Sequence, residues 1–200
     1  MRRIVSAVLS LLVVAGLAGC NWRPPAASVN GADITVADLQ ADLDLMRANP
    51  ELAAAFQLAV PPEGEPVPSE VTANLLTLRI AEAILGQSYR SSDKKLTADE
   101  DQQQRSAVLQ DLTAALGSEA LVAKIPETFL TRLTDRFVHS NALLSDVPDE
   151  DFASTVASLF GGFEVTVDPR YGTWDPANFE VVPDAPPTVG GSSSELLVGQ

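Results

Sequence analysis

The chain has 200 residues, of which 27 are acidic and 13 are basic, so its formal net charge at pH 7 is −14. So acidic a surface repels phosphate backbones and anionic lipid headgroups, which argues against nucleic acid as a partner. Cys20 is the only cysteine, and this excludes intramolecular disulfides and a cysteine-based metal site.

The first 20 residues have the pattern of a secretory signal peptide: Arg2 and Arg3 precede an apolar run, and small residues lead to Cys20. The apolar run is shorter than the ~20 residues that a membrane span needs. Its end, LAGC, resembles a bacterial lipobox, in which the cysteine receives a diacylglycerol thioether and becomes the new N-terminus. The alternative is an ordinary cleaved signal that ends in cysteine. We expect a signal peptide over residues 1–19 and a lipid anchor on Cys20, which together hold the protein at the extracytoplasmic face of the cell membrane.

Residues 20–27 form an expected lipidated tether, in which two prolines favour an extended chain. The stretch SVNGADI (residues 28–34) predicts two strand segments joined by a tight Asn-Gly turn. A capping box, TVAD (residues 35–38), predicts the start of a helix that ends before Pro50. A second short helix is expected over residues 51–59.

Three longer helices are expected over residues 69–89, 97–117 and 126–144. The first has an apolar stripe wide enough for a helix that packs on two sides. A capping box opens the second, a glycine ends it, and a proline precedes the third. A shorter acidic helix is expected over residues 148–159.

The stretch FEVTV (residues 163–167) alternates apolar and polar side chains, which predicts a strand in an otherwise helical chain. A single strand leaves its backbone hydrogen-bonding groups without partners. Residues 28–34 are the one other segment suited to pair with it. We therefore expect a mostly α domain over residues 28–182, closed by a small two-stranded β-sheet from its two ends. Residues 183–200 are rich in proline, glycine and serine, and we expect a disordered tail.

The stretch SVNGADITVADLQADL resembles the N-terminal strand-turn-helix module of SurA and PrsA type extracytoplasmic chaperones. Two later stretches are also similar to that family: LLTLRIAEAILGQSYRSSDKKLTADEDQQQ, a leucine-rich helix with a basic-polar turn and a second helix, and FEVTVDPRYGTWDP, the family's returning strand. In full-length members a parvulin prolyl isomerase module precedes that strand. Here residues 145–162 occupy the interval, which is too short for such a module. The resemblance implies a SurA-N-like helical domain without the isomerase.

A chaperone of this kind needs exposed apolar surface rimmed by charge. We expect such a groove between the long helix and the helix that begins at Pro126. The candidate peptide-binding residues are Leu75, Leu78, Phe129, Leu133, Phe137, Tyr171 and Trp174. The alternative is that the helix residues are plain core. Tyr171 and Trp174 would then cover the end of the sheet, with Arg170 paired to a nearby acid.

Other side chains give little indication of chemistry. His139 is the only histidine, and a lone histidine cannot supply a histidine-based metal cluster, so we interpret it as a partly exposed helix residue. The acidic runs at residues 99–101 and 146–151 lack the spacing of a calcium loop and suit helix starts. The sequence has neither a nucleophile elbow nor a phosphate-binding glycine loop. We expect no enzymatic activity, no metal and no cofactor.

The lipobox-like motif predicts a membrane-anchored lipoprotein, and the resemblance to SurA and PrsA type chaperones implies that it binds unfolded or partly folded secreted polypeptides as a chaperone-like module, without covalent chemistry. Two alternatives are a scaffold lipoprotein that docks one specific envelope partner and a divergent prolyl isomerase. In each case the membrane is reached through the lipid anchor.

Overall fold

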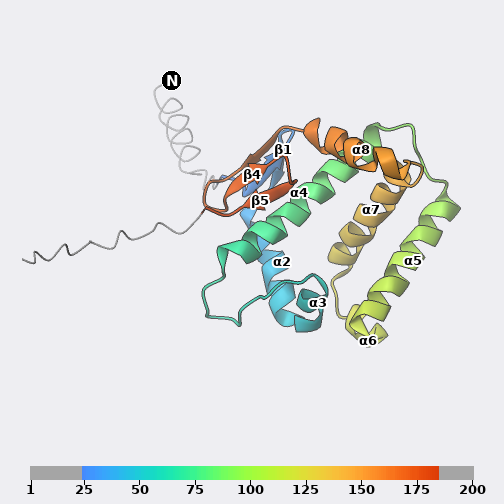
Figure 1. The fold of residues 1–200 in the computed structure, drawn as a ribbon. Coiled ribbons are helices and arrows are strands. Elements are labelled where there is room, and N and C mark those ends of the chain that lie inside the picture. Colours follow the sequence, from blue (N-terminus) through green and yellow to red (C-terminus); the bar gives the residue numbers. More distant parts are fainter. Residues whose placement is uncertain (1–23, 185–200) are drawn as a thin grey trace, which may run out of the picture.

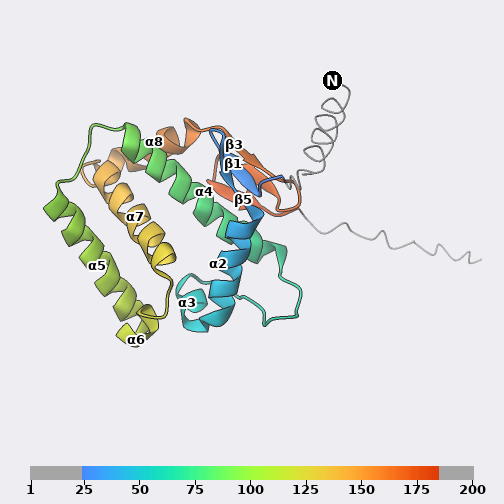
Figure 2. The same ribbon diagram turned by 180° about the vertical axis from the view of Figure 1, so that it is seen from behind.

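The computed structural model describes residues 24–184 and shows a mostly α protein with two small antiparallel sheets at one end (Figures 1 and 2). The predicted signal peptide, Cys20 and the tail from residue 185 lie outside the described residues. The helices of this part are α2 (Val36–Ala48), α3 (Pro50–Ala55), α4 (Ser69–Ser91), α5 (Ala98–Leu116), α6 (Glu119–Val122), α7 (Glu127–Leu144) and α8 (Asp149–Gly161). Its strands are β1 (Ala27–Val29), β2 (Ala32–Ile34), β3 (Val165–Val167), β4 (Thr173–Asp175) and β5 (Glu180–Val182).

The late strand pairs with the first strand, as the sequence predicts. β1 lies between β2 and β3, and both neighbours are antiparallel to it, with Ala27 opposite Val167 in the β1–β3 pair. The sheet therefore has three strands and not the two that we expected, because the second arm of the turn also pairs with β1. Asn30 (φ 48°) and Gly31 (φ 78°) form that turn in the left-handed region. Asn30 also accepts a 2.8 Å hydrogen bond from the backbone N–H of Glu164 through its side-chain oxygen, which ties the turn to the segment before β3.

A second sheet, the hairpin of β4 and β5, is not predicted by the sequence. Trp174 lies opposite Val181 in this hairpin. Val181 is buried, and its backbone N–H donates a 2.8 Å hydrogen bond to the Thr77 side chain on α4. The strands are only three residues long and show little alternation, so their pairing depends on contact with α4 and is not encoded by a local pattern.

The helix boundaries follow local signals. Both predicted capping boxes are present, Thr35 with Asp38 at the start of α2 and Thr97 with Glu100 at the start of α5. Gly117 ends α5 with φ 69°, in the left-handed conformation that glycine adopts without strain.

Two short helices differ from the expectation. α3 ends at Ala55 and not near residue 59, because the chain reverses at Gln57 (φ 57°) and the backbone N–H of Leu58 returns to the carbonyl of Ala53 at 2.8 Å. The four-residue helix α6 between α5 and α7 is not predicted by the sequence; Ser118 caps it.

α4 is the central element of the core. Its largest fully buried side chains are Leu75, Leu76, Ile80 and Ile84. α2 and the strands pack on one side of α4 and α7 packs on the other, which confirms that the wide apolar stripe belongs to a helix covered on two sides (Figure 1). α5 lies beyond α7, and α8 runs across one end of the helices. None of the helices in the described part has the length and apolar character needed to cross a bilayer.

Candidate functional site

Most of the predicted groove residues belong to the core. Leu75, Phe129 and Leu133 are buried, and Leu78 is half-buried. The ring of Phe129 contacts Phe56 edge-on, with centroids 6.1 Å apart. These predicted residues therefore pack into the core between α4 and α7 and do not line an apolar groove, which is the alternative that the sequence left open.

The aromatic residues near the C-terminal hairpin have a structural role. Tyr171 and Trp174 are half-buried and pack against the core. Arg170 forms an ion pair with Asp168, with its Nη2 2.7 Å from the carboxylate. α4 lies between this hairpin and α7, so the predicted site residues do not form one surface (Figures 1 and 2).

Phe137 is the predicted site residue that remains exposed, at 42%. It lies at the edge of a cavity of about 320 Å³ between α5, α7 and the end of α3, which we call the apolar pocket. The apolar side chains that line this pocket are Ala55, Phe56, Val108, Leu112, Ala115, Leu133 and Phe137. Asp111 and Arg136 are the charged residues in its lining.

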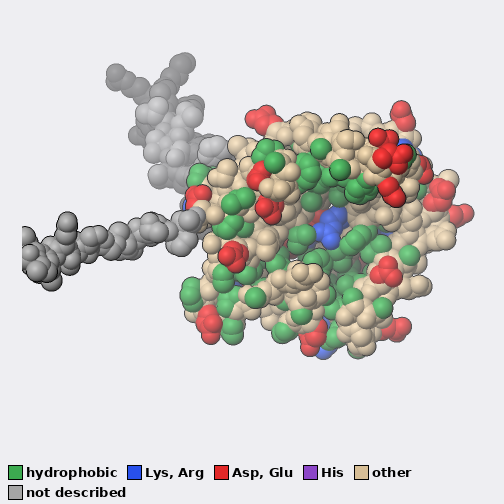
Figure 3. Space-filling view, viewed as in Figure 1, with side chains coloured by type: hydrophobic (Ala, Val, Ile, Leu, Met, Phe, Trp, Pro, Cys, Tyr) green, Lys and Arg blue, Asp and Glu red, His purple; other side chains and the backbone are tan. Residues whose placement is uncertain are grey.

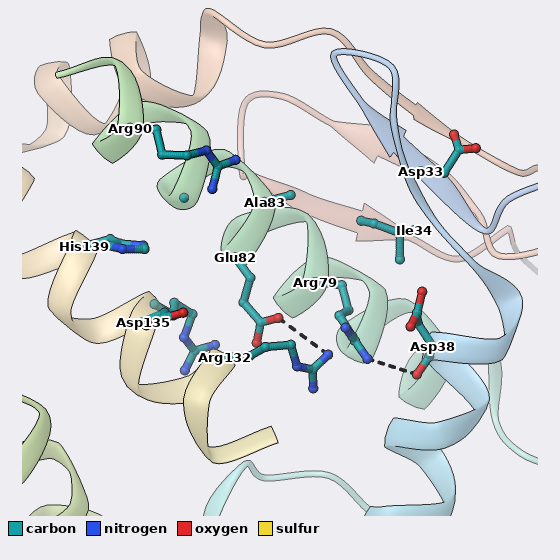
Figure 4. A pocket seen from close by; sticks show the side chains of 12 residues that line it. Asp33, Ile34, Asp38, Arg79, Glu82, Ala83, Arg90, Arg132, Asp135 and His139 are labelled. Carbon is teal, nitrogen blue, oxygen red and sulfur yellow. Dashed lines mark hydrogen bonds and ion pairs between the residues drawn. The ribbon is translucent and has the colours of Figure 1, made fainter. Parts of the chain in front are cut away.

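A second cavity of about 260 Å³ lies between α2, α4 and α7 and is lined mainly by charged side chains (Figure 4). We call it the charged pocket; its basic lining residues are Arg79, Arg90, Arg132 and Arg136. These are four of the seven arginines in residues 24–184, gathered at one place in a strongly acidic chain. Figure 3 shows that one face of the molecule is hollowed near its middle, where basic side chains lie deep within a hydrophobic surround.

Asp42 holds the inner end of the charged pocket together. It is buried on α2, and its two carboxylate oxygens accept hydrogen bonds from Arg79 Nε at 2.5 Å and Arg132 Nη2 at 2.8 Å. Burial raises the pKa of Asp42, and the hydrogen bond from Arg79 opposes that rise. Because the three residues come from α2, α4 and α7, this carboxylate links the three helices.

Glu82 and Arg136 face each other from α4 and α7 without forming an ion pair. Burial raises the pKa of Glu82 from its ordinary value of 4.5 to about 7, and its nearest cation is Arg132, whose Nη1 lies 3.9 Å away. Burial lowers the pKa of Arg136. Its guanidinium lies 4.9 Å from the centre of the Phe137 ring, and it has no hydrogen-bond or ion-pair partner among residues 24–184. Arg136 lines both pockets and therefore lies at their junction.

His139 is half-buried in the wall of the charged pocket, in agreement with its interpretation as a partly exposed helix residue. Its ring stacks on Tyr89 with centroids 4.4 Å apart, and burial lowers its pKa. Within residues 24–184, no cluster of three or more histidine, cysteine, aspartate or glutamate side chains is arranged to hold a metal ion. The arrangement is suited to binding anionic groups through guanidinium donors, because arginine binds carboxylates with directed hydrogen bonds.

The charged pocket is not predicted by the sequence, because its basic residues come from helices far apart in the chain. A local signal was present: Arg132, Arg136 and His139 lie three or four positions apart and therefore share one face of α7. Arg79 and Glu82 share a face of α4 in the same way. Only the packing of α4 against α7 brings the two faces together. Comparisons of the chain with protein-family models, with curated proteins and with solved structures found no match.

Proposed function

We propose that this protein is a lipoprotein, anchored through Cys20 at the extracytoplasmic face of the membrane, that binds non-native secreted polypeptides as a chaperone-like module. The observation that carries the proposal is the pairing of β3 with β1. The resemblance to SurA and PrsA type chaperones implies this pairing, in which a late strand returns to the strand-turn-helix at the start of the domain. The lipid anchor rests on the LAGC motif alone.

The surface beside α7 provides the apolar contacts that such a function needs. Phe137 borders the apolar pocket, and a wider hollow of about 550 Å³ between α5, α6 and α7 is lined by Leu109, Val122 and Leu130. Acidic side chains are scattered around the face drawn in Figure 3. Apolar hollows within an acidic surface favour weak contacts with unfolded chains, while the net charge opposes self-association.

An aggregation assay tests the proposal. The protein, produced from Asn21 onward, is mixed with a chemically unfolded secreted protein, and light scattering is followed. We expect suppression at a near-equimolar ratio, and a reduced effect for Phe137→Ser. Val182→Ser is the matched control, because Val182 is equally exposed (43%) but lies on β5, across α4 from the apolar pocket.

Failure to suppress aggregation at several-fold excess would remove the chaperone function. If Phe137→Ser and Val182→Ser reduce the suppression of aggregation equally, the apolar pocket is not the site that binds unfolded chains. A stoichiometric complex with one folded envelope protein, in place of binding to unfolded chains, would indicate a scaffold. A proline-peptide assay is expected to show no isomerase activity.

A further inference from the structure

The apolar pocket contains two opposite charges that do not pair with each other. Arg136 comes from α7 and Asp111 from α5, and neither has a hydrogen-bond or ion-pair partner among residues 24–184. Arg105, which also lies between α5 and α7, shows the usual outcome: it pairs with Asp101 at 2.6 Å and with Asp135 at 2.7 Å. Among the described residues, the pocket therefore presents one unpaired, partly buried cation and one unpaired, exposed carboxylate beside an apolar wall.

An unpaired guanidinium in a partly buried site is costly, because it has lost water without gaining an acceptor. The Phe137 ring, 4.9 Å from the Arg136 guanidinium, compensates for part of this loss. Glu82 lies on the other side but forms no ion pair with Arg136, and its raised pKa of about 7 means that it carries only part of a charge near neutral pH. A carboxylate delivered by a ligand would supply the missing acceptor.

A ligand that satisfies the whole lining needs three features: a carboxylate for Arg136, a neighbouring N–H donor for Asp111, and an apolar group for the wall formed by Phe56, Leu112 and Phe137. We propose that the apolar pocket binds the C-terminal residue of a polypeptide that has an apolar side chain at that position. The cavity of about 320 Å³ is at the lower end of the ~300–1,000 Å³ range of ligand sites, which suits one residue. A free fatty acid has no donor for Asp111. This inference rests on the proposed function and names the part of the client that is bound.

Peptide binding tests the site. The full chain is held in lipid nanodiscs, and binding of a fluorescent peptide ending in leucine is followed by fluorescence anisotropy, with empty nanodiscs as the blank. The same peptide is measured as its C-terminal amide, together with a peptide ending in serine. We expect the free acid to bind about tenfold more tightly than the amide, because a charge-assisted hydrogen bond is lost. The serine peptide is expected to bind more weakly because it leaves the apolar wall uncovered.

Variants of the pocket residues test whether Arg136 causes the preference for a free carboxylate. Arg136→Met keeps a long apolar side chain and removes the charge, and it should bring the acid-to-amide ratio close to one. Arg136→Lys should restore part of the preference, and Asp111→Asn should weaken the acid and the amide alike. Arg170→Met is the control, because Arg170 is exposed, is paired with Asp168 in the segment between β3 and β4, and lines neither pocket. Thermal unfolding of each variant verifies that it is folded.

Equal binding of acid and amide, or a preference that persists in folded Arg136→Met, would overturn the proposal. Decanoate that binds more tightly than the peptide, with no effect of Asp111→Asn, would overturn it in favour of a free fatty acid. The result of this peptide-binding test can be distinguished from the result of the aggregation assay that tests the proposed function. Suppression of aggregation without a carboxylate preference refutes only this site, whereas an Arg136-dependent preference without suppression refutes only the general chaperone activity.

Discussion

Replacement of Gly172 by alanine is expected to destabilise the protein strongly. Gly172 precedes β4 and has φ 120°, a conformation that residues with a Cβ atom rarely adopt. An added Cβ would overlap the carbonyl oxygen of Val182 and lie 2.8 Å from its carbonyl carbon and 2.9 Å from the Cα of Pro183. These atoms belong to the backbone at the end of β5, so they cannot move aside as a flexible side chain would.

The magnitude combines two costs. A non-glycine residue in a sparsely populated backbone region costs about 1–3 kcal/mol. Displacing packed backbone to make room for extra atoms costs a further ~1–3 kcal/mol. We therefore expect Gly172→Ala to lower the free energy of unfolding by about 2–6 kcal/mol, a large part of the ~5–15 kcal/mol that typical domains have.

Urea unfolding followed by circular dichroism measures this difference. The control is Gly161→Ala at the end of α8, where an added Cβ meets nothing within 4 Å and the backbone is helical. That change should be neutral or should stabilise the protein by up to ~1 kcal/mol. A loss of less than about 1 kcal/mol in Gly172→Ala would refute the reasoning, because the β5 backbone could not then lie against Gly172.

Three further predictions concern the helices. Because burial raises the pKa of Glu82 from 4.5 to about 7, its contribution to the free energy of unfolding is full below pH 4.5 and is lost as the pH rises to about 7. Glu82→Gln should flatten that pH dependence and increase the free energy of unfolding at pH 8 by at most ~3 kcal/mol. Urea unfolding at pH 5 and pH 8 measures the change, and an equal difference between the two pH values in the wild type and in Glu82→Gln would contradict the prediction. Phe129→Ala, in the core, should lower the free energy of unfolding by about 3–5 kcal/mol. Phe137→Ala, at an exposed position of the same helix, should lower it by less than ~1 kcal/mol in the same assay. Comparable losses of stability in the two variants would place both side chains in the core. Thr97→Ala removes the cap of α5 and should lower the free energy of unfolding by ~1 kcal/mol, with Thr113→Ala inside the helix as the comparison.

The sequence predicts those elements that depend on neighbouring residues. The two capping boxes need only a threonine hydroxyl and a carboxylate three residues later, and the Asn30-Gly31 turn needs two residues that tolerate positive φ. The β1–β3 pairing is long-range, yet it was predictable because a strand needs a partner and the chain offered one suitable segment. The β4–β5 hairpin lacked such a signal, since its short strands are stabilised by α4.

Tertiary structure alone decided which apolar residues are exposed and which charges meet. Phe129 and Phe137 lie on the same predicted stripe of α7, yet one is 8% exposed and the other 42%, because Phe129 packs into the core against Phe56 whereas Phe137 lies at the edge of a pocket. Helical periodicity assigns a face to a residue but does not show where along the helix a neighbour ends. The placement of Arg136 in one pocket with Glu82 and in the other with Asp111 likewise depends on the packing of α4, α5 and α7, which is set by side chains distant in sequence. The sequence by itself determined the order and ends of the main helices, because those follow from local hydrogen bonding, and it determined the closing strand pair because only one segment was suited to pair with the late strand. The location and charge of the pockets followed only from how the helices fill space against one another.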